Sequence, residues 1–164
     1  MEKQISIIIP TYNMEKYIGK CLDSLLTPEF EQVEVLVVND GSKDRSSEIA
    51  HGYADRYSGS IRVIDKPNGN YGSCINAALP LATGRYVKVL DADDTFDTEA
   101  FSELVRMLAD IDDDVVVTPF TVVDTDGNIL VSQGFDTAKV NLNSTYRLAE
   151  YDGEFDDYRI QMHQ

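Results

Sequence analysis

The stretch Tyr86-Val-Lys-Val-Leu-Asp-Ala-Asp-Asp94 decides the fold, because an apolar run of strand-forming residues ends there in a cluster of acids. Aspartate is disfavoured within strands, so Asp91, Asp93 and Asp94 mark the end of a strand. Two like charges about 4 Å apart repel each other by about 4 kcal/mol at an effective dielectric constant near 20. A helix cap would explain one of these acids, and a solvated acidic loop would explain all three. A bound divalent cation would turn the repulsion into attraction, and carboxylate oxygens suit Mg²⁺ or Mn²⁺.

Strands and helices alternate in front of this stretch. Short apolar runs predict strands at Ile5–Pro10, Val33–Val38 and Ile61–Ile64, and apolar residues at helical spacing follow each of them. A further helix is expected to begin at Asp97, after the acidic stretch. This alternation predicts an α/β fold with a mostly parallel, Rossmann-like sheet flanked by helices. The nearly continuous apolar strands agree with it, since both faces of such a sheet are covered.

The pattern changes after residue 114. Two apolar runs, Val115–Val123 and Ile129–Val131, flank Asp124-Thr-Asp-Gly-Asn128 and predict two strands joined by a tight turn. Asp124 and Asp126 are therefore interpreted as turn formers and not as ligands. The pattern weakens beyond Ser132, and Glu150–Asp157 is expected to be a solvated acidic surface.

Composition excludes several classes of function. With 164 residues, of which 43% are apolar, the chain is long enough to bury a core. Its net charge of −15 argues against nucleic acid and anionic membranes as partners. Cys21 and Cys74 form no CxxC pair and suit a reduced, cytosolic protein. No signal peptide or membrane span is expected, so we expect a cytoplasmic protein, either free or peripheral at the inner face of the membrane.

Polar clusters follow three of the predicted strands: Thr11-Tyr-Asn13, Asn39-Asp-Gly-Ser42 and Asp91-Ala-Asp-Asp94. Ligands of open parallel sheets bind outside the carboxyl ends of the strands, where the strand order reverses. If the strands are ordered third, second, first, fourth, all three clusters line a crevice between the first and the fourth strand.

Asp40 is the isolated acid of this predicted crevice, and two interpretations of it are open. It can be a turn former, or it can accept a hydrogen bond from an imide N–H such as N3 of uracil. Backbone groups of Pro10–Tyr12 would complete recognition of the base, and Tyr12 would cover its ring. The acid cluster would supply a cation for a diphosphate. Lys66 can add a positive charge or be an ordinary solvated lysine.

Five motifs, in this order, resemble those of the family 2 inverting glycosyltransferases with a GT-A fold. They cover roughly residues 4–95 and are Ser6-Ile-Ile-Ile-Pro-Thr-Tyr-Asn13, Tyr17-Ile with Cys21-Leu-Asp-Ser-Leu-Leu26, Glu34-Val-Leu-Val-Val-Asn-Asp-Gly-Ser-Lys-Asp44, Asn68-Gly-Asn-Tyr-Gly72 and Leu90-Asp-Ala-Asp-Asp94. The resemblance implies transfer of a sugar from a nucleotide-diphosphate donor, commonly a UDP-sugar, to a glycan or lipid-linked acceptor. Mn²⁺ or Mg²⁺ would be the cofactor, and cell-surface polysaccharide or glycan synthesis the setting.

The resemblance places Asp40 on the uracil-binding acid and Asp91 and Asp93 on the DxD motif of the family. Candidate nucleotide-binding residues are Pro10, Thr11, Tyr12, Asn13, Asp40, Lys66, Asn68, Gly72, Asp91 and Ala92, and candidate metal ligands are Asp91, Asp93 and Asp94. Residues 1–132 are expected to form the nucleotide-sugar-binding domain, and residues 133–164 the start of an acceptor-side region that is cut short.

The chain departs from the family pattern at two places. Ile75 stands before Asn76 where the family often has an arginine. The family's general base is an acid in the acceptor-binding half, and none matches before Gln164, because Asp156 and Asp157 come too early. We therefore leave the catalytic base unassigned, expect it beyond Gln164, and expect donor binding with little transfer.

Two other functions compete with this one. Asp91-Ala-Asp-Asp-Thr95 also fits the DxDxT motif of haloacid-dehalogenase-type phosphatases, although that motif ends the first strand of their core. The second alternative is a non-catalytic nucleotide-binding module.

Overall fold

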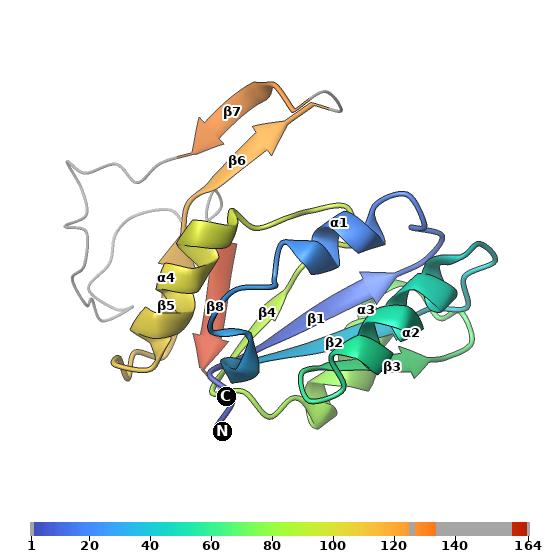
Figure 1. Cartoon of the computed structure of the whole chain (residues 1–164), viewed down its shortest axis with the longest axis horizontal. Coiled ribbons are helices and arrows are strands. Elements are labelled where there is room, and N and C mark those ends of the chain that lie inside the picture. Colours follow the sequence, from blue (N-terminus) through green and yellow to red (C-terminus); the bar gives the residue numbers. More distant parts are fainter. Residues whose placement is uncertain (1, 125–126, 134–158, 164) are drawn as a thin grey trace. The chain divides into compact units, whose positions relative to one another are not determined.

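A computed structural model describes residues 2–124, 127–133 and 159–163 of the chain (Figure 1). The chain divides into two compact units, Met1–Asp112 with His163–Gln164, and Asp113–Met162. The predicted boundary, between a nucleotide-sugar-binding domain and an acceptor-side region, lies at residue 132 and so differs from this one. The assignment of the two regions to donor and acceptor stays a prediction. The first unit contains every candidate site residue.

Four parallel strands form the sheet of the first unit. They are β1 (Ile5–Thr11), β2 (Val33–Asn39), β3 (Ile61–Asp65) and β4 (Tyr86–Val89), in the order β3-β2-β1-β4. Every residue of β1 and β2 is buried, as expected for central strands covered on both faces. The sheet confirms the predicted α/β fold class and the strand order that opens a crevice between β1 and β4.

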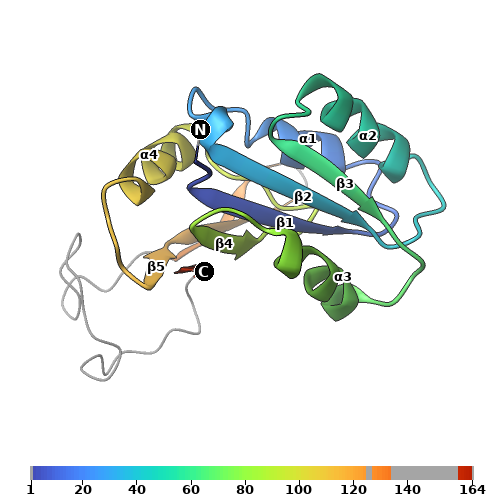
Figure 2. The same ribbon diagram turned by 90° about the horizontal axis from the view of Figure 1, so that it is seen from below.

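Helices cover both faces of this sheet. They are α1 (Ile18–Asp23), α2 (Ser46–Arg56), α3 (Tyr71–Ala78) and α4 (Thr98–Leu108), with short 3₁₀ turns at Phe30–Gln32 and Leu79–Leu81. In Figure 2, α1 and α2 lie on one face of the four strands and α3 on the other. Each connection between parallel strands therefore crosses one face of the sheet and returns, which brings the carboxyl ends of all four strands to one edge.

Two details of the helices differ from prediction. The apolar spacing predicts Ile75, Ala78, Leu79 and Ala82 on the inner face of the third helix and Cys74 in the core. Ala78 and Cys74 are buried as expected, but Leu79 is exposed in the 3₁₀ turn. None of Asp91, Asp93 and Asp94 caps a helix: the cap of α4 is Asp97, whose side chain accepts a hydrogen bond from the Ala100 amide. The capping alternative for the acid cluster is therefore wrong.

The second unit contains two antiparallel pairs. β5 (Val115–Thr118) pairs with β8 (Arg159–His163), a strand that the sequence did not predict, and β6 (Phe120–Val123) pairs with β7 (Ile129–Gln133). The predicted strand Val115–Val123 is thus two strands, divided at Pro119, which lacks the N–H that a ladder needs. Asp124 accepts a hydrogen bond from the Asn128 amide and is a turn former as predicted. Asp126 and Glu150–Asp157, with Asp156 and Asp157, lie outside the described residues.

Within the described part of the chain, no helix is long and apolar enough to cross a membrane.

Candidate functional site

The loops after β1 and β2 are clamped to each other at the edge of the sheet. The Asn13 amide donates to Ser42 Oγ at 3.1 Å, and the Lys43 amide donates back to Asn13 Oδ1 at 2.8 Å. Asp44 accepts from the Glu15 amide at 3.0 Å. Asn13 has a φ of 55°, a left-handed conformation that asparagine tolerates better than most residues. This clamp fixes the position of the two loops that border the crevice.

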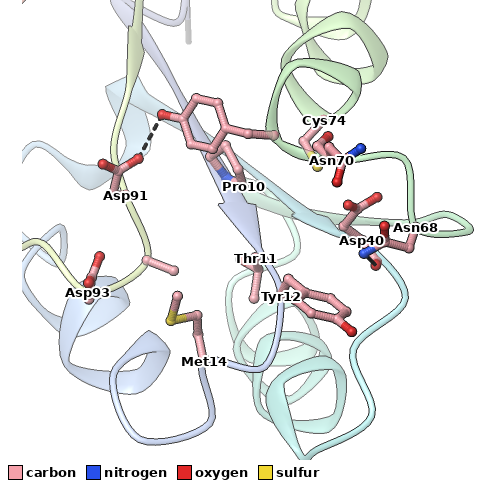
Figure 3. A pocket seen from close by; sticks show the side chains of 12 residues that line it. Pro10, Thr11, Tyr12, Met14, Asp40, Asn68, Asn70, Cys74, Asp91 and Asp93 are labelled. Atoms are coloured by element: carbon pink, nitrogen blue, oxygen red, sulfur yellow. Dashed lines mark hydrogen bonds between the residues drawn. The ribbon is translucent and has the colours of Figure 1, made fainter.

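A pocket of about 560 Å³ opens at the carboxyl ends of the strands, as Figure 3 shows. Its volume falls within the usual range of small-molecule sites, about 300–1,000 Å³. Residues from all three predicted clusters line it, together with the loop that leads into α3. The lining residues are Pro10, Thr11, Tyr12, Met14, Asp40, Asn68, Asn70, Tyr71, Cys74, Asp91, Ala92 and Asp93.

Asp40 forms one end of the pocket, and its side chain is only 4% exposed. Lys66 Nζ lies 2.5 Å from Asp40 Oδ1, and the Gly69 amide donates to the same oxygen at 2.9 Å. Burial would by itself raise the pKa of Asp40, but the hydrogen bonds and the charge of Lys66 outweigh it, so the pKa is lowered. Asp40 is therefore a buried, ionised carboxylate that acts only as a hydrogen-bond acceptor.

The other end of the pocket is acidic. In Figure 3, Asp91 and Asp93 project from the segment after β4, on the opposite side of the pocket from Asp40. The Tyr71 hydroxyl donates to Asp91 Oδ1 at 2.7 Å and links the start of α3 to this segment. Burial, followed by the charges of Asp94, Asp93 and Asp91, raises the pKa of the Cys21 thiol to about 12. All three acids thus lie close enough to act on one thiol of α1.

The acid cluster is not a complete metal site by itself. Among the described residues, no group of three or more Asp, Glu, His or Cys side chains is arranged to hold a metal ion. Mg²⁺ is commonly bound by one or two carboxylates, with phosphate oxygens of the substrate and water completing its shell. Asp91 and Asp93 both line the pocket and supply that number of hard oxygen ligands. The residues therefore fit a cation that binds together with a diphosphate.

Eight of the candidate residues line the pocket: Pro10, Thr11, Tyr12, Asp40, Asn68, Asp91, Ala92 and Asp93. The other four do not. Asn13 belongs to the clamp, Lys66 pairs with Asp40, Gly72 is exposed in the first turn of α3, and Asp94 closes a turn by donating its amide to the Asp91 carbonyl. The interpretation of Lys66 as a solvated lysine is wrong, since its side chain is 19% exposed and paired.

Sequence reasoning missed Met14, Asn70, Tyr71 and Cys74 as lining residues. Asn70 and Tyr71 belong to a quoted motif, and their position at the start of the third helix was the available signal. Ile75, which replaces the arginine common in the family, is half-buried and does not line the pocket.

Residues 6–158 match the model of the family "Glycosyl transferase family 2". The chain belongs to this family. It is 44% identical over 119 residues to a protein of Mycoplasma pneumoniae named "Uncharacterized glycosyltransferase MG025 homolog", covering 70% of this chain and 38% of the relative. It is 29% identical over 143 residues to the minor teichoic acid biosynthesis protein GgaB of Bacillus subtilis, covering 86% of this chain and 15% of that protein.

The fold is that of GT-A glycosyltransferases. A crystal structure of residues 1–349 of S. aureus TarS in complex with UDP-GlcNAc is similar with a TM-score of 0.59 and 35% identity, over 68% of this chain and 33% of that chain. This member of family 2 therefore spans well under half the length of each relative named here. The family match argues against the phosphatase alternative. The position of Asp91 does so too, because it follows the fourth strand along the chain, whereas the phosphatase motif ends the first strand.

Proposed function

We propose that the pocket of this family 2 protein binds a UDP-type nucleotide sugar, and that the protein takes part in metal-dependent, inverting transfer of the sugar to an acceptor hydroxyl. The observation that carries the proposal is the pairing of two unlike ends in one pocket. Asp40, a buried carboxylate, lies at one end, and the carboxylates of Asp91 and Asp93 lie at the other. A nucleoside diphosphate has the matching pair of ends, a base edge and an anionic diphosphate.

The base end supports a uracil nucleotide. Asp40 can accept a hydrogen bond from N3–H of uracil, and backbone groups of Pro10 and Thr11 border the same space. Tyr12 is 46% exposed at the pocket rim and offers a ring face for stacking. The similarity to TarS, whose complex contains UDP-GlcNAc, agrees with this donor class.

The acidic end supports a cation-bridged diphosphate. Asp91 and Asp93 would hold Mn²⁺ or Mg²⁺, with Asp94, which lies outside the pocket lining, as a further candidate ligand. When bound, the cation would neutralise negative charge on the departing diphosphate, an effect worth several kcal/mol. The chain's own groups orient the donor by holding its base at Asp40 and its phosphates near Asp91. Without the cation, the carboxylates would repel the diphosphate.

We also propose a biosynthetic role and a cellular location for the protein. A relative named as a teichoic acid biosynthesis protein supports a role in cell-surface polysaccharide synthesis, with a glycan or lipid-linked acceptor. A cytoplasmic location suits the two cysteines, which are unpaired and buried. We assign no general base to the residues of the donor pocket.

Isothermal titration calorimetry of the whole chain tests the donor proposal. UDP should bind in the presence of Mn²⁺, and adding EDTA should weaken that binding by about tenfold or more, the loss of a few kcal/mol of bridging interaction. Titration with aluminium fluoride, a phosphatase ligand, should give no heat. Binding of UDP that is indifferent to EDTA would refute the bridging cation, and absence of UDP binding would refute the donor site. Release of UDP from a UDP-sugar with candidate acceptors would separate a transferase from a binding module.

A further inference from the structure

Lys66 was predicted to bind the nucleotide, but its ammonium group contacts the carboxylate of another candidate residue, Asp40. Lys66 follows β3 directly, and its Nζ contacts Asp40 Oδ1 at 2.5 Å, the Pro67 carbonyl at 2.8 Å and Ser73 Oγ at 2.8 Å. An ammonium group has three protons to donate, and these three acceptors account for them. These hydrogen bonds hold the ammonium group of Lys66 against Asp40, at the base end of the pocket.

The strand order brings this pair together. β2 and β3 are parallel neighbours whose ends pair Asn39 with Asp65, so the next residues, Asp40 and Lys66, leave adjacent strand ends. The Lys66 amide also donates to the Asn39 carbonyl at 3.0 Å, which continues the ladder by one residue. The register of β2 and β3 therefore places the backbones of Asp40 and Lys66 side by side.

The surroundings of Asp40 make this partner necessary. Lys66 is the charged group that faces Asp40 from β3, and the buried thiol of Cys74 faces it from α3. The Cys74 pKa is raised, first by burial and then by the charge of Asp40, so the thiol stays neutral. The other titratable side chains that line the pocket are those of Tyr12, Tyr71, Asp91 and Asp93, and none of them carries a positive charge. Without the lysine, a carboxylate that is 4% exposed would keep only neutral donors, namely backbone amides and the Cys74 thiol.

On the basis of the proposed function, we infer that Lys66 is a positioning residue that keeps Asp40 a pure hydrogen-bond acceptor. Through this effect on Asp40, Lys66 makes the site select uracil over cytosine nucleotides. An ionised carboxylate accepts from N3–H of uracil, whereas N3 of cytosine is itself an acceptor and is repelled. A protonated carboxyl would donate to N3 of cytosine and lose its preference for uracil. The identity of the base is therefore read by Asp40, but the charge state that makes the reading possible comes from Lys66.

Base selectivity measured against pH tests this inference. The ratio of the dissociation constants of CDP and UDP, both with Mn²⁺, cancels the contribution of the shared diphosphate. In the wild-type protein this ratio should favour UDP by about tenfold, as expected for one well-placed bond, and stay constant between about pH 5.5 and pH 8. In Lys66→Met the burial of Asp40 is no longer opposed by the ammonium group. The ratio should fall toward one as the pH is lowered.

Matched variants isolate the cause. Lys20→Met removes the same charge from an exposed lysine of α1, outside the pocket lining, and should leave the ratio unchanged at every pH. Lys66→Arg keeps a positive charge and should preserve selectivity for UDP. In the Asp40→Asn background, Lys66→Met should add no pH dependence, because the titrating carboxyl is gone. Thermal melts of each variant establish that it is folded, and Ser73→Ala, which removes one acceptor of the ammonium, should give a weaker form of the same effect.

The ¹³C shift of the Asp40 carboxyl, followed by NMR in the protein without nucleotide, gives a second readout. It should titrate below the usual range for aspartate in the wild type and above it in Lys66→Met. A pH-independent UDP preference in folded Lys66→Met, or an unchanged Asp40 titration, would overturn the inference. Failure of the wild type to bind UDP would instead overturn the proposed donor site, with the NMR titration still deciding whether Lys66 controls Asp40.

Discussion

The hydroxyl of Tyr71 donates a 2.7 Å hydrogen bond to Oδ1 of Asp91 and so joins the first residue of α3 to the segment after β4. The two residues are 20 positions apart in the chain, and both line the pocket. Asp91 is the candidate residue shared by nucleotide and metal binding, so this bond fixes one of its two oxygens and leaves the other to a ligand.

Removal of this hydroxyl should weaken nucleotide binding moderately. A net hydrogen bond contributes about 0.5–1.5 kcal/mol, so Tyr71→Phe should raise the dissociation constant of UDP with Mn²⁺ about 3- to 10-fold. Calorimetry provides the measurement, and Tyr17→Phe, at a half-exposed tyrosine outside the pocket lining, is the matched control. If Tyr71→Phe instead binds UDP more tightly, the bond is a latch that the ligand must open and not a support for Asp91.

Loss of the charge of Asp93 should abolish the increase in affinity for UDP that Mn²⁺ provides. Asp93 is exposed at the pocket, so Asp93→Asn should leave the fold intact while removing one of the two lining carboxylates available to a cation. We expect the dissociation constant with Mn²⁺ to rise by about tenfold or more, equal to about 1.4 kcal/mol or more. In EDTA the variant should bind UDP at least as tightly as the wild type, because it lacks one of the carboxylates that repel the diphosphate.

The control for this variant is Asp55→Asn, which removes one negative charge from an exposed position of α2. It should leave the effect of Mn²⁺ unchanged. An equal gain from Mn²⁺ in Asp93→Asn and the wild type would remove Asp93 from the metal site.

The strand ends could be predicted from the sequence, and they supply most of the residues of the candidate site. The apolar runs before Tyr12, Asp40 and Asp91 end in polar residues, and a parallel sheet necessarily gathers such ends at one edge. The contact of Lys66 with Asp40 was also within reach, since both residues directly follow neighbouring strands. It was missed because the lysine was considered as a partner for phosphate and not for the acid of the adjacent strand.

The residues contributed by α3 could not be predicted in the same way. Apolar spacing assigned Ile75, Ala78, Leu79 and Ala82 to its inner face, but the helix ends at Ala78, and Leu79 lies exposed in the 3₁₀ turn. Cys74 lies on the same face as Ala78, one turn earlier, and it is buried as expected but also lines the pocket, which its apolar surroundings in the sequence did not indicate. The division of Val115–Val123 was missed for another reason: Pro119 was included in a strand whose hydrogen bonds it cannot complete.

Asn70 stores backbone strain that glycine should relieve. Its φ of 68° and ψ of 171° lie in a region adopted almost only by glycine, and such residues cost about 1–3 kcal/mol. The added freedom of glycine in the unfolded chain offsets about 0.4–1 kcal/mol of this. Asn70→Gly should therefore raise the free energy of unfolding by about 1 kcal/mol, measured by urea denaturation.

Asn76→Gly provides the contrast, because Asn76 lies exposed within the regular part of α3. Glycine ranks below asparagine in helix propensity, so this variant should be slightly less stable than the wild type. Destabilisation by both substitutions would mean that the side chain of Asn70 contributes more than its backbone conformation costs.

Glu34 should make the stability of the protein depend on acid pH. It is buried in β2, where Ser6 Oγ donates to one of its oxygens, the Thr83 amide donates to the same oxygen at 2.7 Å, and Arg62 donates to the other at 3.0 Å. Burial would raise its pKa, but these donors outweigh burial and lower it. The unfolded chain therefore binds the proton more readily, and the stabilisation is complete above the unfolded pKa of about 4.3. It is lost as the pH falls through the lower pKa of the folded state.

Substitution of this carboxylate by an amide should remove that dependence along with part of the stability. Glu34→Gln leaves donors of Thr83 and Arg62 facing a neutral group, so the free energy of unfolding at pH 7 should drop by about 1–3 kcal/mol. Urea denaturation between about pH 3 and pH 7 should show a shallower acid slope than in the wild type, where several other carboxyls also titrate. Glu103→Gln, at an exposed position of α4, should retain the wild-type slope. If the curves of Glu34→Gln and the wild type run parallel across that range, the donors do not lower the pKa of Glu34 in the folded protein.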